Sequence, residues 1–353
     1  MGPVAVAPST IPTSSRAAAA LDRLPAGTVE TGAASLASAY GCAATDAHRR
    51  QAQELLVAPL LLEPDWPDPT PPLSFAGGAV HADLIEDDLD TFAALRAAAA
   101  TERAPSPEAL ADLAQACRLP VTPYASRATL RRRSNDTPAT PAGPELRSPG
   151  SPPTPPGRVV DLSTHWAGPL ATALLADAGW EVIKIDSIAR PDGFRPRAAL
   201  FAALNGAKTQ HQLDLRLPDD RLTFERLVGE ADLLVSSFSP RVLPNLGYGR
   251  DQLGRLAPRL RTLSISAFDP AGPRAGWVAY GPGVHAASGL ADHGNPGAPR
   301  FRACPVAYPD ALAGMAAFAA AVDPTSPRHV EVSLDGAIAP VCGIAARAED
   351  GMA

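Results

Sequence analysis

The stretch Ala307–Gly314, which reads AYPDALAG, holds one carboxylate in a position where it could do chemistry. Pro309 keeps Tyr308 in an extended conformation and presets its own backbone for the start of a helix. Asp310 then opens a run of small apolar residues, and negative charge is favoured at a helix N-terminus. Taken alone, this pattern favours a helix N-cap. The residues upstream decide whether a ligand is brought to the carboxylate.

Other polar residues gather at one predicted edge of a parallel sheet. The loop Ser163–Pro169 follows an apolar strand and carries His165 and Trp166. Open α/β sheets bind ligands in loops at this edge. Asn205 and Lys208, in ALNGAKTQ, lie on a polar loop at the same edge. The sequence therefore predicts that this edge accepts an anionic small molecule.

The elements that position these residues follow an α/β pattern. Arg158–Asp161, Gly168–Ala178 and Glu181–Asp186 read as strand, helix and strand of one βαβ unit. Further strand and helix patterns follow, and we expect four or five parallel strands. No G-x-G-x-x-G occurs at the first turn, which argues against a nicotinamide or flavin site. The predicted fold class is α/β: an open parallel Rossmann-like sheet without G-x-G-x-x-G, a small C-terminal domain and a mainly helical N-terminal part.

Helical spacing marks the first part of the chain. Ser15–Leu24, Val29–Tyr40 and Asp46–Val57 read as helices, and a proline-rich loop follows them. Residues 73–84 predict a short strand and a turn. Two more helices follow between residues 87 and 119, and they lead into a short extended segment, LPVTPY.

Composition divides the chain into five stretches. Residues 126–157 are dense in proline and poor in apolar side chains, so burial cannot offset the entropy lost on ordering them. The predicted organisation is a disordered tail (1–15), a mainly helical part (16–125), a Pro-rich linker (126–157), an α/β domain (158–270) and a segment with Asp310 and the start of a small domain (271–353).

Length and composition describe a globular protein. The chain has 353 residues, of which 46% are hydrophobic, so it can bury a substantial core. A net charge of −6 argues against nucleic acid as the main partner, and the longest apolar run is too short to span a bilayer. No secretory signal is visible, so we expect a cytoplasmic protein. The four cysteines are scattered without metal-ligand spacing, so we expect no metal site.

Six ordered motifs run from the first predicted strand to the stretch with Asp310. They read DLSTHWAGPLATALLADAGWEVIKID, LNGAK with QLDL, ADLLVSSFSPRVLPNLGYGRDQL, APRLRTLSISAF, YGPGVHAASGL and AYPDALAG. In this order they resemble the class III CoA-transferases, a family that includes formyl-CoA and carnitine-CoA transferases and 2-methylacyl-CoA racemases. The resemblance covers roughly residues 158–340, just over half of the chain.

The resemblance implies a CoA-transferase whose small-molecule partners are an acyl-CoA and a carboxylic acid. Coenzyme A is then a co-substrate, and no cofactor is tightly bound. The resemblance also implies that Asp310, with Gly314 in a D-x-x-x-G motif, is the nucleophile and carries CoA as an aspartyl thioester. Residues 158–270 become the CoA-binding domain. The residues carried over as CoA contacts are His165, Trp166, Ala167, Arg190, Arg195, Asn205, Lys208, Phe238 and Arg241.

Two of the motifs depart from the family pattern at basic residues. The family's N-F-R-P-G reads SFSPR here, which keeps Phe238 and Pro240 and moves the basic residue to Arg241. Arg190 and Arg195 match an Arg-bearing loop of the family and are expected to contact nucleotide phosphates. Surface solubility is the alternative meaning of these two arginines.

Tyr280 and His285 are the other candidate catalytic residues. Racemases carry His where Tyr280 stands, and transferases often carry Gln where His285 stands. Racemisation needs two acid/base groups, and tyrosine is a poor base at neutral pH. His285 would substitute if its ring reaches the site, and otherwise it is a polar residue on a helix face. The alternative functions are an acyl-CoA racemase and a non-catalytic acyl-binding partner in a biosynthetic pathway.

The order of the segments is a further departure from the family. Class III members continue well past the helix after the catalytic Asp, whereas this sequence ends at residue 353. TGAASLASAYG and ALADLAQACRLPVTPY resemble segments of that later part, so we expect residues 16–125 to supply it in permuted order. An unrelated appended helical domain is the alternative. Family members form interlocked dimers, so a homodimer is expected, without nucleic acid or membrane as a partner.

Overall fold

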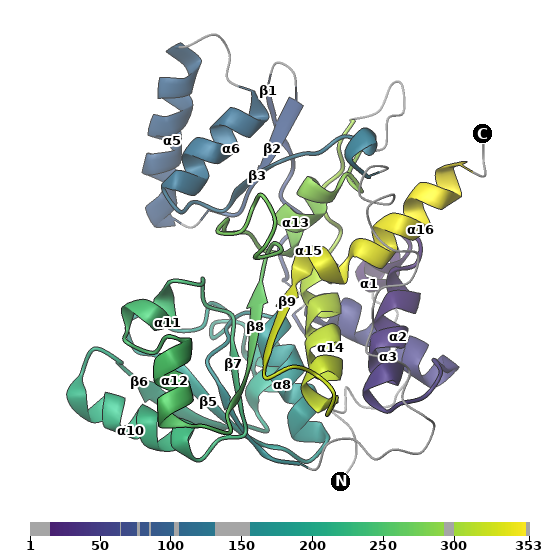
Figure 1. Ribbon diagram of the computed structural model, residues 1–353. Helices are drawn as coiled ribbons and strands as arrows, with labels where there is room; N and C mark the ends of the chain where they lie inside the picture. The colour runs from purple at the N-terminus through teal and green to yellow at the C-terminus, as the bar shows by residue number, and fades with distance from the viewer. Residues whose placement is uncertain are drawn as a thin grey trace.

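The computed structural model describes residues 15–63, 65–75, 78–84, 86–101, 106–130, 156–292 and 300–350 (Figure 1). The predicted disordered tail, apart from Ser15, lies outside these residues. So does most of the predicted Pro-rich linker. Within the described part, no helix is long and apolar enough to cross a membrane.

A six-stranded parallel sheet forms the centre of the molecule, in the order β6-β5-β4-β7-β8-β9. This is the order of a doubly wound sheet, in which the chain runs outward from the middle in both directions. The sequence predicted four or five parallel strands, which is fewer than the six observed. The sixth strand carries His329 and Glu331 on an edge that is not fully buried, so its apolar pattern is weak. The strands are β4 (Arg158–Asp161), β5 (Glu181–Ser187), β6 (Thr209–Leu213), β7 (Leu233–Ser236), β8 (Arg261–Ser266) and β9 (His329–Ser333).

The helices between these strands cover both faces of the sheet. Successive residues of a strand point to opposite faces. Val159 and Val235 accordingly join one apolar cluster with α8 and α14, while Val160 and Leu234 join another with α10 and α12. The helices are α8 (Ala167–Asp177), α9 (Ala198–Asn205), α10 (Pro218–Gly229), α11 (Val242–Asn245), α12 (Arg250–Leu256), α13 (Gly281–Ser288), α14 (Tyr308–Val322), α15 (Leu334–Ala337) and α16 (Ala339–Asp350).

The helix that begins beside Asp310, α14, is buried along almost its whole length between α8 and α2. Its small side chains let the neighbouring helices approach closely. Gly314 marks a close approach to α8, because a Cβ atom there would lie 2.7 Å from the carbonyl oxygen of Ala167. The Asp310 end of α14 is therefore held in a fixed position relative to the sheet.

Two of the first four helices, α2 and α3, pack against α14 (Figure 1). The four are α1 (Ser15–Leu21), α2 (Thr28–Ala39), α3 (Asp46–Leu56) and α4 (Ala58–Leu62), and the three predicted helices in this region are confirmed to within a few residues. Leu36 and Leu56 belong to the same apolar cluster as Leu312 and Met315. The start of the chain thus contributes to the core of the α/β part.

The remaining N-terminal residues form a separate small layer against α13. Three antiparallel strands, in the order β1-β2-β3, pack with two helices. The elements are β1 (Leu73–Phe75), β2 (Gly78–Ala82), α5 (Glu86–Thr101), α6 (Pro107–Ala116) and β3 (Val121–Pro123). Residues 16–125 therefore contact two different parts of the later chain, and their role as a permuted replacement stays a prediction.

Candidate active site

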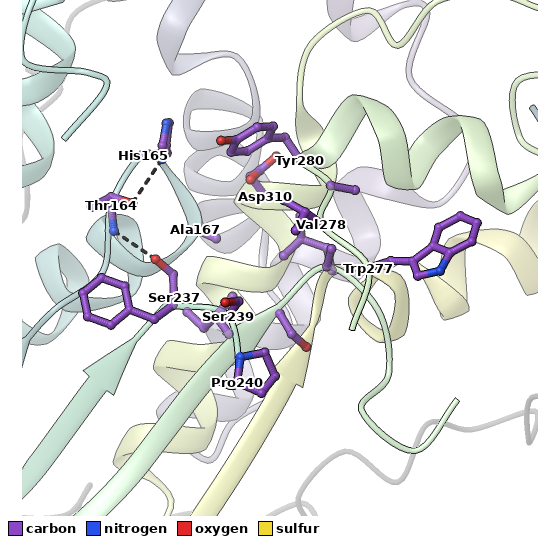
Figure 2. Close-up of a pocket in the computed structure, with 16 residues that line it drawn as sticks. Thr164, His165, Ala167, Ser237, Ser239, Pro240, Trp277, Val278, Tyr280 and Asp310 are labelled. Carbon is purple, nitrogen blue, oxygen red and sulfur yellow. Dashed lines mark hydrogen bonds between the residues drawn. The ribbon is translucent and has the colours of Figure 1, made fainter. Parts of the chain in front are cut away.

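A cavity of about 190 Å³ opens where the strand order of the six-stranded sheet reverses (Figure 2). The loops after β4 and β7 diverge here, because their chains continue in opposite directions across the sheet. These loops, the end of β8 and the segment 277–280 line the cavity. Asp310 closes it on the side of α14. The cavity therefore lies where a doubly wound sheet binds ligands.

The carboxyl group of Asp310 is almost completely buried, with 8% of the residue exposed. It is not the N-cap of α14, because that helix begins at Tyr308 and its N-cap is Ala307. The backbone N–H of Gly281 donates a hydrogen bond of 2.8 Å to Oδ2 of Asp310. Burial raises the pKa of Asp310 to about 7, even though the Gly281 hydrogen bond favours the charged form. The carboxyl group thus titrates near neutral pH, and the N-cap interpretation of its side chain is wrong.

Gly281 is a site residue that the sequence motifs alone did not single out. A Cβ atom at this position would lie 2.1 Å from Oδ2 of Asp310, so a larger residue cannot occupy it without moving the carboxylate. Gly281 is also the first residue of α13, where its N–H is free of helical hydrogen bonding. The signal in the sequence is the run YGPG, whose proline marks a helix start.

His165 and Tyr280 form the wall of the cavity beside Asp310 (Figure 2). Their ring centroids are 5.1 Å apart. His165 has a left-handed backbone conformation, with φ 65°, and its N–H donates to Oδ1 of Asp192. Burial lowers the pKa of His165 and raises that of Tyr280, and both shifts favour the neutral ring.

Two further residues of the predicted CoA-binding loop have different surroundings. Ala167 lines the cavity. Trp166 is 2% exposed and belongs to the apolar cluster beneath the loop, outside the residues that line the cavity. Thr164, one residue earlier than His165, donates its N–H to Oγ of Ser237 and so ties the β4 loop to the β7 loop.

His285 is not among the residues that line the cavity beside Asp310. Its Nδ1 lies 2.8 Å from the hydroxyl oxygen of Tyr308, and the residue is buried. It lines a different cavity, of about 750 Å³, and not the one beside Asp310. The ring is therefore not within the set of residues around the candidate nucleophile.

Asn205 and Lys208, which the sequence places on a polar loop at this edge, face the interior of the protein. Both side chains are buried, and Nζ of Lys208 bonds to Oδ1 of Asn205, Oδ2 of Asp161 and Oγ1 of Thr172. Burial would raise the pKa of Asp161, but the neighbouring ammonium groups lower it to about 2. This network ties α9 to the first βα turn of the sheet. It leaves neither side chain on the cavity.

The remaining predicted CoA contacts are divided between the cavity and the surface. Phe238 lines the cavity. Arg195 is half-buried and pairs with Asp186, while Arg190 and Arg241 are exposed and line no part of this cavity. Contact between these arginines and a nucleotide stays a prediction. Among the described residues, no group of three His, Cys, Asp or Glu side chains could hold a metal ion.

Comparison with known proteins gives the same family for this part of the chain. Residues 157–324 match CoA-transferase family III. The chain is 31% identical over 197 residues to acetyl-CoA:oxalate CoA-transferase from Acetobacter aceti, which covers 51% of each chain. It is 34% identical over 180 residues to a probable CoA-transferase from Mycobacterium tuberculosis, which covers 45% of this chain and 23% of the relative.

A solved structure is also similar to this chain. It is a CAIB/BAIF family protein from Brucella suis, with a TM-score of 0.49 and 26% identity over 57% of this chain and 58% of the other. The chain spans about half or less of the length of the curated relatives described above. The matched residues include five strands of the sheet, β4 to β8, together with the cavity loops and Asp310. The similarity to CoA-transferase family III is therefore carried by residues 157–324.

Proposed function

We propose that this protein transfers coenzyme A from an acyl-CoA to a carboxylic acid, with Asp310 as the covalent nucleophile. The observation that carries the proposal is the buried carboxyl group of Asp310 at the ligand-binding edge of the sheet, held by the N–H of Gly281. The named relatives, which include an acetyl-CoA:oxalate CoA-transferase and a succinyl-CoA–D-citramalate CoA-transferase, support the same reaction class.

In the proposed reaction, a carboxylate oxygen of Asp310 attacks the thioester carbonyl carbon. The C–S bond breaks and CoA leaves as a thiolate. The acyl group stays bound to Asp310 as a mixed anhydride. The thiolate then attacks Cγ of Asp310, which releases the donor acid and leaves an aspartyl-CoA thioester. The acceptor carboxylate attacks Cγ in turn, which releases the CoA thiolate and forms a second mixed anhydride. The thiolate then attacks the acyl carbon of the acceptor, and this step forms the new acyl-CoA and restores the carboxylate of Asp310. No proton is gained or lost over the cycle.

Burial of Asp310 supports this role in two ways. A carboxylate that has lost most of its water is a stronger nucleophile than one that is fully solvated. A cavity that excludes water also protects the anhydride and the thioester from hydrolysis. Since only the ionised form attacks, transfer should increase as the pH rises through about 7, where Asp310 titrates.

The racemase alternative has less support from the arrangement of the site. It needs two acid/base groups on opposite sides of one carbon atom. His285, which would supply the second group, lies against Tyr308 and lines a different cavity. Tyr280 does line the cavity, but burial raises its pKa further above neutral.

Isotope exchange tests the proposed transfer. Purified protein is incubated with acetyl-CoA and ¹⁴C-labelled acetate, and in parallel with succinyl-CoA and labelled succinate. Label should enter the acyl-CoA with wild-type protein, and Asp310→Asn should reduce the rate at least about a thousandfold. Equal rates for the wild type and Asp310→Asn would refute a nucleophilic role. A folded wild type that exchanges neither pair would favour the non-catalytic acyl-binding alternative.

A further inference from the structure

One wall of the cavity beside Asp310 has no regular secondary structure. Residues 277–280 belong to neither a helix nor a strand, yet all four line the cavity. Backbone N–H and C=O groups away from water need partners. The partners of Val278, in the middle of this wall, come from the part of the chain before residue 126.

Gln115, on α6, supplies two of these partners. Its Oε1 accepts a hydrogen bond of 2.7 Å from the N–H of Val278, and its Nε2 donates one of 2.8 Å to the carbonyl oxygen of the same residue. The second Nε2 hydrogen goes to the carbonyl oxygen of Val121, at 2.9 Å. With 6% of the residue exposed, both donors of the amide are used and none is left for water. Gln115 thus pairs with Val278 as a neighbouring strand would.

Two further contacts join the same surfaces on either side of Val278. Nη1 of Arg118 donates a 2.7 Å hydrogen bond to the carbonyl oxygen of Gly276. Oγ1 of Thr122 donates one of 3.0 Å to the carbonyl oxygen of Gly283, where a Cβ atom would lie 3.1 Å from that hydroxyl. The small N-terminal layer is therefore bonded to the chain both before and after the cavity wall.

The wall leads directly to the group that holds Asp310. Tyr280 is its last residue, and the next N–H, that of Gly281, is the donor to Oδ2 of Asp310. Since consecutive Cα atoms are a fixed distance apart, a shift of Val278 is passed to Gly281 over three residues. The position of that donor therefore depends on what fixes Val278.

We propose that Gln115 is a positioning residue of the active site: its side-chain amide fixes the cavity wall at Val278 and, through it, the Gly281 N–H that holds Asp310. The small N-terminal layer is then part of the site, although Gln115 lies 163 residues before Val278 in the chain. The effect on catalysis rests on the proposed function, whereas the effect on the wall does not.

Hydrogen exchange measures the wall directly and needs no activity. Gln115→Met has a side chain of similar length without donors or acceptors of comparable strength. It should speed the exchange of backbone amides in peptides spanning residues 276–283 about tenfold, since hydrogen bonds to two backbone groups are lost. Leu110→Ala removes apolar packing from the same layer while it keeps the Gln115 amide, and it controls for general loosening. Gln252→Met, on the exposed side of α12, is the matched control for the substitution itself.

Three outcomes are distinguished. The first compares Gln115→Met with Leu110→Ala at comparable thermal stability. If residues 276–283 exchange faster in Gln115→Met than in Leu110→Ala, the proposal is supported. Equal exchange in these two variants overturns it. If Gln115→Met does not fold, Arg118→Met tests the same wall through its exposed contact with Gly276, and unchanged exchange there counts against the proposal.

Kinetics then separate this inference from the proposed function. If the wild type is active in the isotope-exchange assay, Gln115→Met should lower kcat about tenfold with little change in KM for the acyl-CoA. The midpoint of its pH profile should rise, because a weaker Gly281 hydrogen bond stabilises the carboxylate less. A wild type without transferase activity refutes the proposed function alone, and an unchanged pH midpoint with normal kcat refutes the positioning role alone.

Discussion

At the scale of single residues, one carboxyl group and one glycine form the centre of the candidate active site. Asp310 is kept out of water, and Gly281 approaches it so closely that only a hydrogen atom fits in place of a side chain. The same N–H would be available to hold the oxygen atoms of Asp310 as its charge changes during transfer. The consequences for Gly281 and for the ionisation of Asp310 can be measured separately.

Gly281→Ala should abolish most of the transfer activity. The added Cβ atom would lie 2.1 Å from Oδ2 of Asp310, so the carboxylate or the start of α13 must move. A fall in kcat of at least about a hundredfold is expected, as for the loss of a placed donor. Gly254→Ala is the control, because a Cβ atom there meets nothing within 4 Å. Full activity of Gly281→Ala would show that the close approach is unimportant.

Asp310→Asn should change the pH dependence of stability. A carboxyl group whose pKa rises from about 4 in the unfolded chain to about 7 in the folded protein binds protons more tightly when folded. Its contribution to stability is fully present below pH 4 and is lost as the pH rises through 7. Asparagine does not titrate, so the variant does not lose stability in this way. The free energy of unfolding of the variant minus that of the wild type should therefore increase by up to about 4 kcal/mol from pH 4 to pH 8. Urea unfolding at both pH values measures the gain, and a constant difference would contradict a raised pKa.

At the scale of elements, the sequence predicted the central βαβ units well because their apolar patterns are local. The predicted strand Arg158–Asp161 has the observed bounds, and the predicted helix Gly168–Ala178 is shifted by one residue. Lys208 could not be placed in this way, since Asp161 and Thr172 lie 47 and 36 residues from it. The contact of Gln115 with Val278 spans 163 residues and leaves no periodic signal. Contacts of this kind are decided by tertiary packing, not by local pattern.

The close packing of α8 on α14 gives a prediction at this scale. Gly314→Ala should destabilise the protein by about 1–3 kcal/mol, because the new Cβ atom would lie 2.7 Å from the carbonyl oxygen of Ala167. Gly254→Ala, in the middle of α12, should instead stabilise slightly, since alanine favours a helix over glycine by up to about 1 kcal/mol. Thermal unfolding of both variants compares the signs. Stabilisation by Gly314→Ala would show that the two helices are not in tight contact.

At the scale of the whole molecule, α2 from the first part of the described chain and α16 from its last part share one apolar cluster with α14 (Figure 1). The apolar cluster on that side of the sheet contains residues of α2 and α3 as well as of α8, α14 and α16. The core would be incomplete without the first hundred residues. This arrangement is consistent with the predicted permuted order, which stays a prediction. The expected homodimer is also a prediction, and light scattering that gives a monomer would contradict it.

Cutting the chain tests whether its two parts hold together without a covalent link. A protease site introduced between residues 131 and 155 divides the elements up to β3 from those that begin with β4. The two fragments should elute together in size-exclusion chromatography, because buried side chains such as Leu36 and Met315 share one cluster. An uncut sample provides the control. Separation of the fragments under native conditions would show that the N-terminal part is an appended unit.

The most direct test of the central claim is to trap the covalent intermediate. Wild-type protein is mixed with acetyl-CoA or succinyl-CoA, treated with hydroxylamine and digested for mass spectrometry. The account predicts a hydroxamate on the peptide that contains Asp310, absent from Asp310→Asn and from wild type without acyl-CoA. A wild type that exchanges label between acid and acyl-CoA but never forms a hydroxamate at Asp310 would contradict the account.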